Sequence, residues 1–501
     1  MIKKLKIKNF KAFKNEQTIR IAPITLIYGP NSAGKSSIIQ SLQLLNQSFL
    51  NLDAIRNLEL APKGADLDLG LPINFMHRGN TKNPLVFSFS SIVNLNSIRI
   101  VKNQKNPKVD DSVELDIKLE FMQEKIEDPY SPLKVQSAEY IIKKNIEGEL
   151  YKFTFKKIED INNTFKFENK TSITNAAKFF YRYNKEKNDL IKSRSKLELT
   201  KSKKEMSIKS LEQEFKDLIF SNHSMFFEPN FFPTYLPQRE SNREDKTFEH
   251  SWGWNMLMSD LNTPIERTIR HCQHISGLRN KPQRFYPLTN TRGFVGRTGE
   301  NMAGLLLKLS KGGNQNQLNK WLKNLEIPYQ ISVAPIKDSL AGSLLIIKLK
   351  DLRNNVEVTP SDVGIGISQI LPLLIQGLSE VSKSTTHGRR SVADIKCVEQ
   401  PELHLHPKLQ ANIADFFIDT VKKSKNLRWI LETHSEALML RLQKRIRNRE
   451  IDPSLVSIIY INPTGGGYSD ANELRIDEDG DFIDEWPNGF FEESYREKFL
   501  N

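Results

Sequence analysis

The sequence has very few cysteines and no long apolar segment. Only two of its 501 residues are cysteines, Cys272 and Cys397, and they lie far apart in the chain. They cannot form a disulfide framework or a cysteine zinc site, which is typical of proteins from a reducing compartment. No apolar run approaches the roughly 18 residues of a membrane span, and the basic start MIKKLKIKNF lacks the features of a signal peptide. We therefore expect a cytoplasmic protein without membrane contact.

Composition and charge exclude a mostly disordered chain but leave the partner open. Hydrophobic residues make up 38% and charged residues 27% of the sequence, enough for a packed core. The formal net charge is +13. A basic protein is compatible with nucleic acid, because phosphate contacts dominate that affinity. Lysines spread along a chain are just as often a soluble surface, so nucleic acid remains an open alternative as a partner.

The strongest motif is a glycine-rich segment that follows a short apolar run. Residues 24–27 have the length of a buried strand, and residues 36–45 have the apolar spacing of a helix. The segment between them, GPNSAGKSS, matches G-x-x-x-x-G-K-[ST]. The candidate nucleotide-binding residues are Gly29, Pro30, Asn31, Ser32, Ala33, Gly34, Lys35, Ser36 and Ser37.

The residue types in this segment suit a triphosphate. Glycines let backbone N–H groups point at phosphate oxygens, and the following helix N-terminus adds positive potential. Lys35 would reach the β- and γ-phosphates, and the Ser36 hydroxyl would bind Mg²⁺. The sequence therefore predicts a phosphate loop for ATP and Mg²⁺.

A second acidic motif lies more than 350 residues further on. The strand expected at residues 395–398 ends in Glu399, Gln400, Pro401 and Glu402. An acid at the carboxyl end of a buried strand is where a nucleotide-binding sheet needs a group for Mg²⁺ and its water. A head of ordinary domain size cannot span this gap without an insertion. We expect an α/β fold: a mixed sheet with a P-loop helix, assembled from N- and C-terminal segments around an α+β or helical insertion.

These motifs, taken in order, resemble a known family. The start IKKLKIKNFKAFK with GPNSAGKSS, then SDVGIGISQILP, VEQPELHLHP and ETHSE, are similar to the ABC-type head of SMC, RecF-like and OLD-like ATPases. The tail, ending in WPNGFFEES, resembles a short C-terminal domain on one branch of these ATPases. Several relatives on that branch act in bacterial antiphage systems beside a nuclease. The resemblance covers about 1–90 and 270–501.

The resemblance implies roles for further residues. Glu399 takes the place of the Walker B aspartate and would hold Mg²⁺ with Ser36, while His434 would sense the γ-phosphate. Ser361 and Gly364 would form the signature that touches the partner's nucleotide, with Gly366 and Ser368 as the alternative alignment.

Two other features of the family, the glutamine loop and a nuclease domain after the histidine, are not evident in this sequence. The segment MHRGN, residues 76–80, lies where the glutamine loop falls but has no glutamine. The stretch after His434 is too short for a nuclease domain of ordinary size, so we expect none within this chain.

One departure from the family concerns catalysis. The catalytic glutamate usually follows the Walker B acid directly, and here that residue is Gln400. An amide cannot accept a proton from water, and losing a general base commonly costs about 10²- to 10⁴-fold in rate. We therefore expect firm ATP binding and slow hydrolysis. Two alternatives remain: Glu402 substitutes as the base, or Gln400 only orients water for another group.

We expect four segments along the chain: an N-terminal ATPase half at 1–95, an insertion at 96–265, a C-terminal ATPase half at 266–440 and a short domain at 441–501. Within the insertion, residues 183–216 are highly charged, without glycine or proline, and predict a helix without a heptad seam. They form either a solvated insertion or a basic arm for a partner or DNA.

Two smaller patterns favour ordinary structural roles. His404 and His406 are two residues apart, but a pair without a third ligand is a poor zinc site, so we expect a turn there. The run IDEDGDFIDE lacks the full calcium-loop spacing and predicts an acidic turn.

Three functions compete at this point. The first is an ATPase that pairs with itself, as a homodimer or higher oligomer, and regulates an effector protein such as a nuclease or toxin in phage defence. The second is a DNA-binding clamp in repair or chromosome maintenance. The third is a scaffold that binds ATP without turnover.

Overall fold

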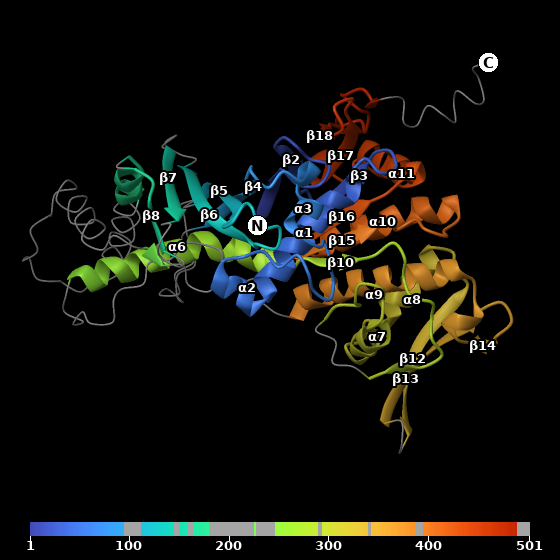
Figure 1. Cartoon of the computed structure of the whole chain (residues 1–501). Coiled ribbons are helices and arrows are strands. Elements are labelled where there is room, and N and C mark those ends of the chain that lie inside the picture. The colour runs from blue at the N-terminus through green and yellow to red at the C-terminus, as the bar shows by residue number, and fades with distance from the viewer. Residues whose placement is uncertain are drawn as a thin grey trace, which may run out of the picture. The chain divides into compact units, whose positions relative to one another are not determined.

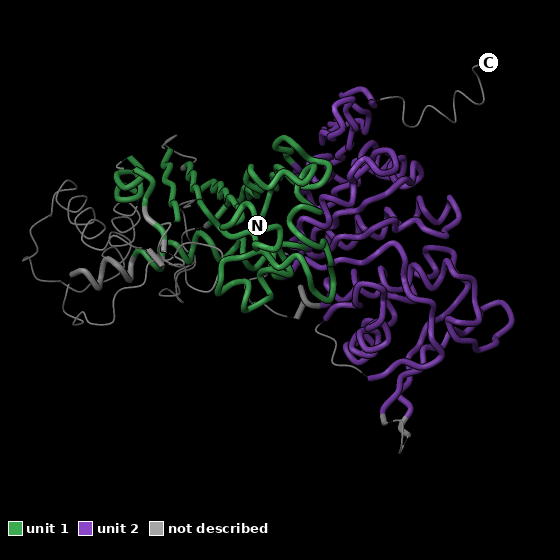
Figure 2. The backbone as a smooth tube through the Cα atoms, viewed as in Figure 1, with its two compact units in different colours: residues 1–18, 44–270 green, residues 19–43, 271–501 purple. Residues whose placement is uncertain are grey.

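The protein is described by a computed structural model covering residues 1–94, 112–144, 150–157, 164–169, 171–179, 225–226, 246–288, 293–338, 342–386 and 394–487. Two compact units make up the chain (Figure 2). Unit 1 comprises residues 1–18 and 44–270, and unit 2 comprises residues 19–43 and 271–501. Both units therefore combine segments that are distant in sequence.

Unit 2 is built on a six-stranded sheet. Its strands, in spatial order, are β10 (Gln273–Ile275), β15 (Asp394–Glu399), β16 (Leu427–Glu432), β3 (Ile24–Tyr28), β17 (Val456–Pro463) and β18 (Ser469–Leu474). The first five run parallel, and β18 is antiparallel to β17. Since β3 lies between strands from the far end of the chain, the mixed sheet is assembled from both ends, as predicted.

Helices connect these strands. The apolar faces of α7 (Met302–Lys311), α8 (Gln315–Asn324), α9 (Ile365–Thr386), α10 (Pro407–Lys423) and α11 (Glu436–Arg447) form one core with the sheet. Helix α1 (Lys35–Leu50) follows β3 and crosses the boundary between the units. The buried cluster includes Leu26 of β3, Phe417 of α10 and Trp429 of β16. The all-buried pattern of β3 is what a central parallel strand requires.

Helix α9 is long and apolar enough to cross a membrane by length and composition alone. Its most apolar segment, Ile365–Ser382, is 78% buried within the protein. Leu371, Leu374 and Leu378 are part of the unit 2 core, so the hydrophobicity of α9 is used in packing.

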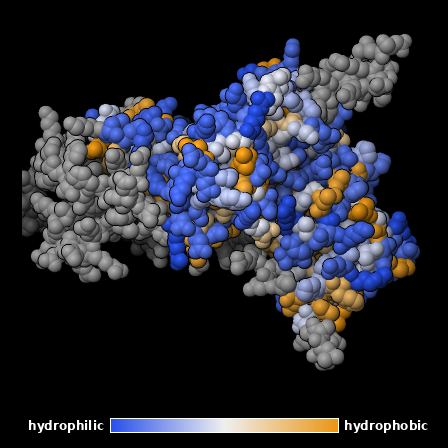
Figure 3. Space-filling model, viewed as in Figure 1, coloured by the Kyte–Doolittle hydropathy of each residue, from blue (hydrophilic) through white to orange (hydrophobic). Residues whose placement is uncertain are grey.

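A smaller antiparallel sheet belongs to the same unit. The strands are β11 (Tyr286–Pro287), β13 (Gly342–Asp351) and β12 (Tyr329–Asp338), with β14 (Glu357–Val358) also paired to β13. Strands β12 and β13 form the long hairpin at the bottom of Figure 1. Leu352 and Val356 are exposed in the turn between β13 and β14, and hydrophobic residues are visible around this region in Figure 3.

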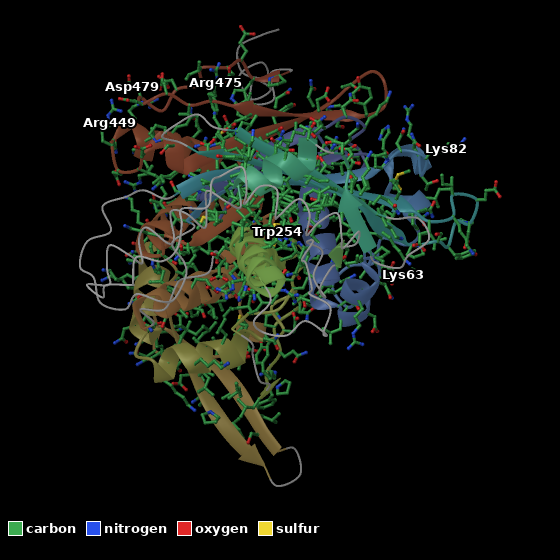
Figure 4. All side chains as sticks on the ribbon, turned by 90° about the vertical axis from the view of Figure 1, so that its left-hand side faces the viewer. Lys63, Lys82, Trp254, Arg449, Arg475 and Asp479 are labelled. Atoms are coloured by element: carbon green, nitrogen blue, oxygen red, sulfur yellow. The ribbon has the colours of Figure 1, made fainter. Side chains whose placement is uncertain are left out.

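The chain after α11 includes η4 (Pro453–Leu455) and the last two strands, and then an acidic turn. Asp477 accepts hydrogen bonds from the backbone N–H groups of Asp479 and Asp481, and Gly480 adopts φ 78°. Arg449, two residues after the end of α11, pairs with Asp479 at 3.2 Å, and the two lie close together in Figure 4. The prediction of an acidic turn is therefore confirmed.

Unit 1 is dominated by an antiparallel sheet. Its strands, in spatial order, are β2 (Gln17–Arg20), which crosses the boundary between the units, β1 (Ile2–Lys8), β4 (Leu85–Asn94), β5 (Ser112–Gln123), β6 (Leu133–Lys144), β7 (Leu150–Lys157), β8 (Thr164–Phe167) and β9 (Met225–Phe226). The helical elements of unit 1 include α2 (Leu52–Asn57), α3 (Pro72–Phe75), η1 (His77–Gly79), a helical segment at 171–179 and α6 (Lys246–Arg270).

One face of this sheet packs on α6. Trp254 of α6 is 1% exposed and contacts the rings of Phe153 and Phe167. It is labelled in Figure 4 within the green helix. The insertion thus contains an α+β layer, whereas the charged stretch at 183–216 lies outside the described residues.

Candidate nucleotide site

The phosphate loop joins β3 to α1 and has the strained backbone that its sequence predicts. Gly29 has φ 144°, and a Cβ there would lie 2.6 Å from the carbonyl oxygen of Ile461. Ser32 and Gly34 also have positive φ values of 61° and 105°. These angles are accessible mainly to glycine, so Gly29 and Gly34 permit a tight loop before the helix.

Lys35 and Ser36 begin α1 and turn toward the loop and the sheet edge. The Lys35 ammonium donates to the carbonyl oxygens of Gly29 at 3.0 Å and Pro30 at 2.8 Å. Burial lowers the pKa of Lys35, although the charges of Glu432 and Glu402 oppose this. The Ser36 hydroxyl donates to Oε1 of Glu432 at 3.0 Å. Along the rest of the loop, Asn31 and Ser32 are exposed, while Ala33 and Ser37 are buried.

Two carboxylates face each other at the carboxyl edge of the sheet. Glu399 ends β15 and Glu432 ends β16, and the parallel register pairs these two residues directly. β16 also pairs with β3, which leads into the phosphate loop. The topology therefore brings Glu399, Glu432 and Ser36 to one edge from segments nearly 400 residues apart.

The two carboxyl groups have opposite pKa shifts. Burial raises the pKa of Glu432, and the negative charges of Glu399 and Glu402 raise it further, against the Ser36 hydrogen bond. At Glu399 burial also acts to raise the pKa, but the nearby His274 ring, the Gly277 N–H and the charge of Arg297 outweigh it and hold the pKa below its usual value. A nearby cation would therefore stabilise the charged form of Glu432.

Glu402 ties the loop after β15 to the loop after β16. One carboxylate oxygen accepts from the Thr433 hydroxyl at 2.8 Å and the other from the His434 backbone N–H at 2.7 Å. Its side chain is buried, and burial raises its pKa. Because both oxygens already accept hydrogen bonds, Glu402 is better placed to hold the His434 loop than to meet a water molecule.

His434 lies in the loop between β16 and α11. Burial lowers its pKa, and the positive charge of Lys35 lowers it further. Two hydrogen bonds of neighbouring residues attach this loop to β3. The Thr433 N–H donates to the Ile27 carbonyl oxygen at 3.2 Å, and the Tyr28 hydroxyl donates to the Ser435 carbonyl oxygen at 3.0 Å. The His434 loop is therefore bound to the strand that carries the phosphate loop.

Gln400 directly follows Glu399 and has a left-handed backbone, with φ 44°. Its N–H donates to the Glu432 carbonyl oxygen at 2.7 Å. A Cβ on Gly277 would lie 3.2 Å from the Gln400 side-chain oxygen, so the backbone at Gly277 packs closely on the Gln400 amide.

The predicted signature lies at the start of α9. Ser361, in the short helix η3 (Pro360–Asp362), and Gly364 are exposed. A Cβ on Gly364 would meet nothing within 4 Å. In the alternative alignment, Gly366 packs against the His404 carbonyl and Ser368 bonds the Pro360 carbonyl. Ser361 and Gly364 are thus the pair that presents an open surface.

The remaining candidates have surroundings of their own. His77 and Arg78 belong to unit 1, where His77 Nδ1 lies 2.8 Å from the Lys11 carbonyl oxygen. His406 caps the N-terminus of α10, and His404 lies in the turn before it.

Sequence reasoning missed Glu432 and Arg279. Glu432 belongs to the motif ETHSE, but only the strand register shows that it faces Glu399. Arg279 follows β10, and its guanidinium donates to the carbonyl oxygens of Gln369 at 3.2 Å and Glu399 at 3.0 Å. Burial lowers the pKa of Arg279 to about 10, against the charges of Glu402 and Glu399. It links α9 to the end of β15, and no motif in the sequence marked it.

The residues at this edge fit Mg²⁺ bound together with a triphosphate. Oε2 of Glu432 is buried without a hydrogen-bond partner among the described residues. Mg²⁺ prefers oxygen ligands and takes most of them from phosphates and water. No group of three His, Cys, Asp or Glu side chains in the described residues could hold a metal ion.

A phosphate loop on a parallel sheet, with acids at the adjoining strand ends, defines a P-loop nucleoside triphosphatase. A family model, described as AAA ATPase domain, matches residues 1–439. The chain therefore belongs to the AAA ATPase domain family and is an ATP-binding ATPase. No curated protein matches it in sequence.

Several solved structures are distantly similar. An Smc head bound to the C-winged-helix domain of ScpA is 11% identical with TM-score 0.37, covering 95% of this chain and 98% of that one. An Smc head with an extended coiled coil, from Pyrococcus furiosus, is 12% identical with TM-score 0.37, covering 95% and 96%. The SMC head from Thermotoga maritima is 9% identical with TM-score 0.34, covering 95% and 99%. Likenesses this distant define neither the fold nor the function of this chain.

Proposed function

We propose that this chain is an ATPase head that binds ATP with Mg²⁺ and pairs with a second copy around the nucleotide. It hydrolyses ATP slowly and thereby regulates an effector protein such as a nuclease in bacterial antiphage defence. The observation that carries the proposal is the meeting of Ser36, Glu399 and Glu432 at one sheet edge.

The chemistry at this edge assigns a task to each group. The loop backbone and the Lys35 ammonium bind the β- and γ-phosphates once Lys35 leaves the carbonyls of Gly29 and Pro30. When bound, Mg²⁺ neutralises charge that develops on the phosphates. Ser36, Glu399 and Glu432 would hold it and its water. His434 donates toward the γ-phosphate, in a loop that Glu402 holds in place.

Slow hydrolysis follows from the group beside Glu399. The amide of Gln400 can orient water but cannot remove its proton. Glu402 already accepts two hydrogen bonds, so it offers no ready replacement. ATP would then stay bound for long enough to act as a timer for the effector.

Self-pairing is supported by the open signature. Ser361 and Gly364 are exposed at the start of α9, with free space over Gly364. In a two-fold pair each head would complete the ATP site of the other. The antiphage role and the effector rest on the resemblance of the motifs and the tail.

A DNA clamp remains the second candidate because the net charge is +13. The described strands of unit 1 give it little support, since several of their lysines pair with glutamates. Examples are Lys118 with Glu120 at 2.6 Å and Lys152 with Glu139 at 2.8 Å. Paired lysines have less positive charge to offer to phosphates.

The test is to purify the chain together with the products of its neighbouring genes, with and without ATP. An effector that co-elutes only with ATP supports the proposal, whereas salt-dependent duplex binding by the lone chain supports the clamp. If ATP binds but no phosphate is released with any partner or DNA, the chain is a scaffold without turnover.

Lys35→Ala is the matching variant. We expect it to weaken ATP binding by about 10- to 100-fold, because it removes a charge-assisted contact. Lys320→Ala, at an exposed position of α8, serves as the control and should bind normally. Unchanged ATP affinity in Lys35→Ala, measured by titration calorimetry, would show that the loop is not the nucleotide site.

A further inference from the structure

A buried histidine joins the helix of the phosphate loop to the Walker B acid. His274 of β10 is 6% exposed, and Gln43 of α1 is also 6% exposed. Nε2 of the Gln43 amide lies 2.6 Å from Nδ1 of His274. On the other side of the ring, Nε2 of His274 lies 3.2 Å from Oε1 of Glu399. The three side chains form a chain from α1 to the end of β15.

The hydrogen-bonding capacity of these groups determines which ring nitrogen of His274 carries the proton. The Gln43 amide donates to Nδ1, so the neutral imidazole must carry its proton on Nε2. That proton then points at the Glu399 carboxylate, which is the favourable arrangement. With the reverse amide orientation, a neutral ring would place an unprotonated Nε2 against a carboxylate, two acceptors in a buried site, and only a ring protonated on both nitrogens would keep a donor toward Glu399. Glu399 therefore selects the tautomer that Gln43 supports.

The contact to Glu399 does not use the full hydrogen-bonding capacity of His274 Nε2. Nε2 makes no fully aligned hydrogen bond with any group that the structure describes. The second oxygen of Glu399 faces the Gly277 N–H at 3.5 Å, also a long contact. The Glu399 carboxylate thus has two donors at long distance, the His274 ring N–H and the Gly277 N–H. The first of these donors is oriented by Gln43, which belongs to α1.

We infer that His274, oriented by Gln43, is a positioning residue that aims the Glu399 carboxylate at the metal of a bound ATP–metal complex. The inference deepens the proposed function and rests on it. A histidine behind an acidic ligand fixes that ligand's orientation, and loss of such supporting groups typically weakens metal binding or activity by about 10- to 100-fold. Because Gln43 belongs to α1, a shift of this helix on nucleotide binding would reach Glu399 through the imidazole.

The experiment compares substitutions that keep or remove the donor. Gln places its amide nitrogen near the position of histidine Nε2, so His274→Gln keeps a donor toward Glu399, whereas His274→Ala removes it. Mn²⁺ is titrated into ATP-saturated protein and followed by electron paramagnetic resonance, and phosphate release is measured against Mg²⁺ concentration. We expect His274→Ala to need about 10- to 100-fold more metal in both assays, with His274→Gln close to wild type. Gln43→Met should lie between them.

Controls separate this inference from the proposed function and from damage to the fold. ATP binding without metal should stay unchanged in every His274 and Gln43 variant. Gln376→Ala removes another buried amide, which bonds Val295 and Glu380 instead, and should leave the metal dependence as in wild type. If wild type binds no Mn²⁺ with ATP, the proposed function fails. If wild type binds it and His274→Ala has the same metal dependence, or His274→Gln is as weak as His274→Ala, the inference alone is wrong.

Discussion

Gln400 combines a strained backbone with a side chain that lacks catalytic power. Its φ of 44° is uncommon for a residue with a Cβ, and its N–H bond to Glu432 at 2.7 Å helps to hold that conformation. Strain of this kind persists only where surrounding contacts fix it. The same backbone would therefore direct the side chain of a glutamate to the same place.

Gln400→Glu should raise the rate of phosphate release by up to about 100-fold, because a carboxylate can accept a proton from water. Single-turnover measurements at saturating ATP isolate this step, and ATP affinity should change little. Gln317→Glu, at an exposed position of α8, adds the same charge elsewhere and should leave the rate unaltered. An unchanged rate in Gln400→Glu with intact ATP affinity would contradict its placement at the base position.

The site was only partly predictable at the level of residues. Lys35 and Ser36 are recognisable because the whole loop is contiguous in sequence, and the loop geometry follows from its glycines. Glu432 and His274 are different. Their roles depend on β10, β15 and β16 being neighbours in that order, which local sequence does not encode.

At the scale of elements, the strands of unit 1 carry ion pairs between side chains of the same strand or of neighbouring strands. Glu120 of β5 pairs with Lys118 at 2.6 Å and accepts from the Ser137 hydroxyl of β6 at 2.8 Å. Burial acts to raise the pKa of Glu120, but hydrogen bonds from Lys118 and Ser137 outweigh it, so the pKa is lowered. A carboxyl group with a lowered pKa stabilises the fold above its unfolded pKa and loses this effect as the pH falls.

Glu120→Gln should therefore lower the free energy of unfolding by at most about 1 kcal/mol at pH 7, since the group is partly exposed. The difference from wild type should shrink as the pH falls below the unfolded pKa of about 4.3. Urea unfolding at pH 7 and at low pH measures both values. Glu127→Gln, at an exposed position beyond β5, should show no difference at either pH. A penalty independent of pH would assign the effect of Glu120 to packing instead of charge.

Most elements of the ATPase half were predictable from hydrophobic period. The apolar run at 24–27 is β3, the helix expected over 36–45 lies within α1, and the strand expected at 395–398 is β15. Their pairing was not predictable in the same way. The all-apolar β3 has no polar face to fix a neighbour, so its place between β16 and β17 depends on the packing of the whole unit.

At the scale of the whole molecule, the ATP site depends on both ends of the chain. Ser36 lies near the N-terminus, whereas Glu399 follows some 360 residues later and Glu432 nearly 400 residues later, yet the side-chain oxygens of Ser36 and Glu432 are 3.0 Å apart. The proposed signature residues Ser361 and Gly364 belong to the same unit and are exposed, and a Cβ on Gly364 would meet nothing within 4 Å. A group that is exposed and contacts little within its own chain is free to contact another molecule.

Gly364→Gln should therefore disturb association between heads without disturbing the head itself. The backbone at Gly364 does not have a positive φ, and a Cβ there would meet nothing within 4 Å, so the fold and ATP affinity should be kept. In a pair the added side chain would occupy space intended for the partner's nucleotide, and ATP-dependent dimerisation should fall at least tenfold. Sedimentation velocity with ATP and Mg²⁺ measures this. Gly465→Gln introduces the same side chain at another open glycine of unit 2 and should pair normally. Equal dimerisation of the two variants would remove Gly364 from the interface.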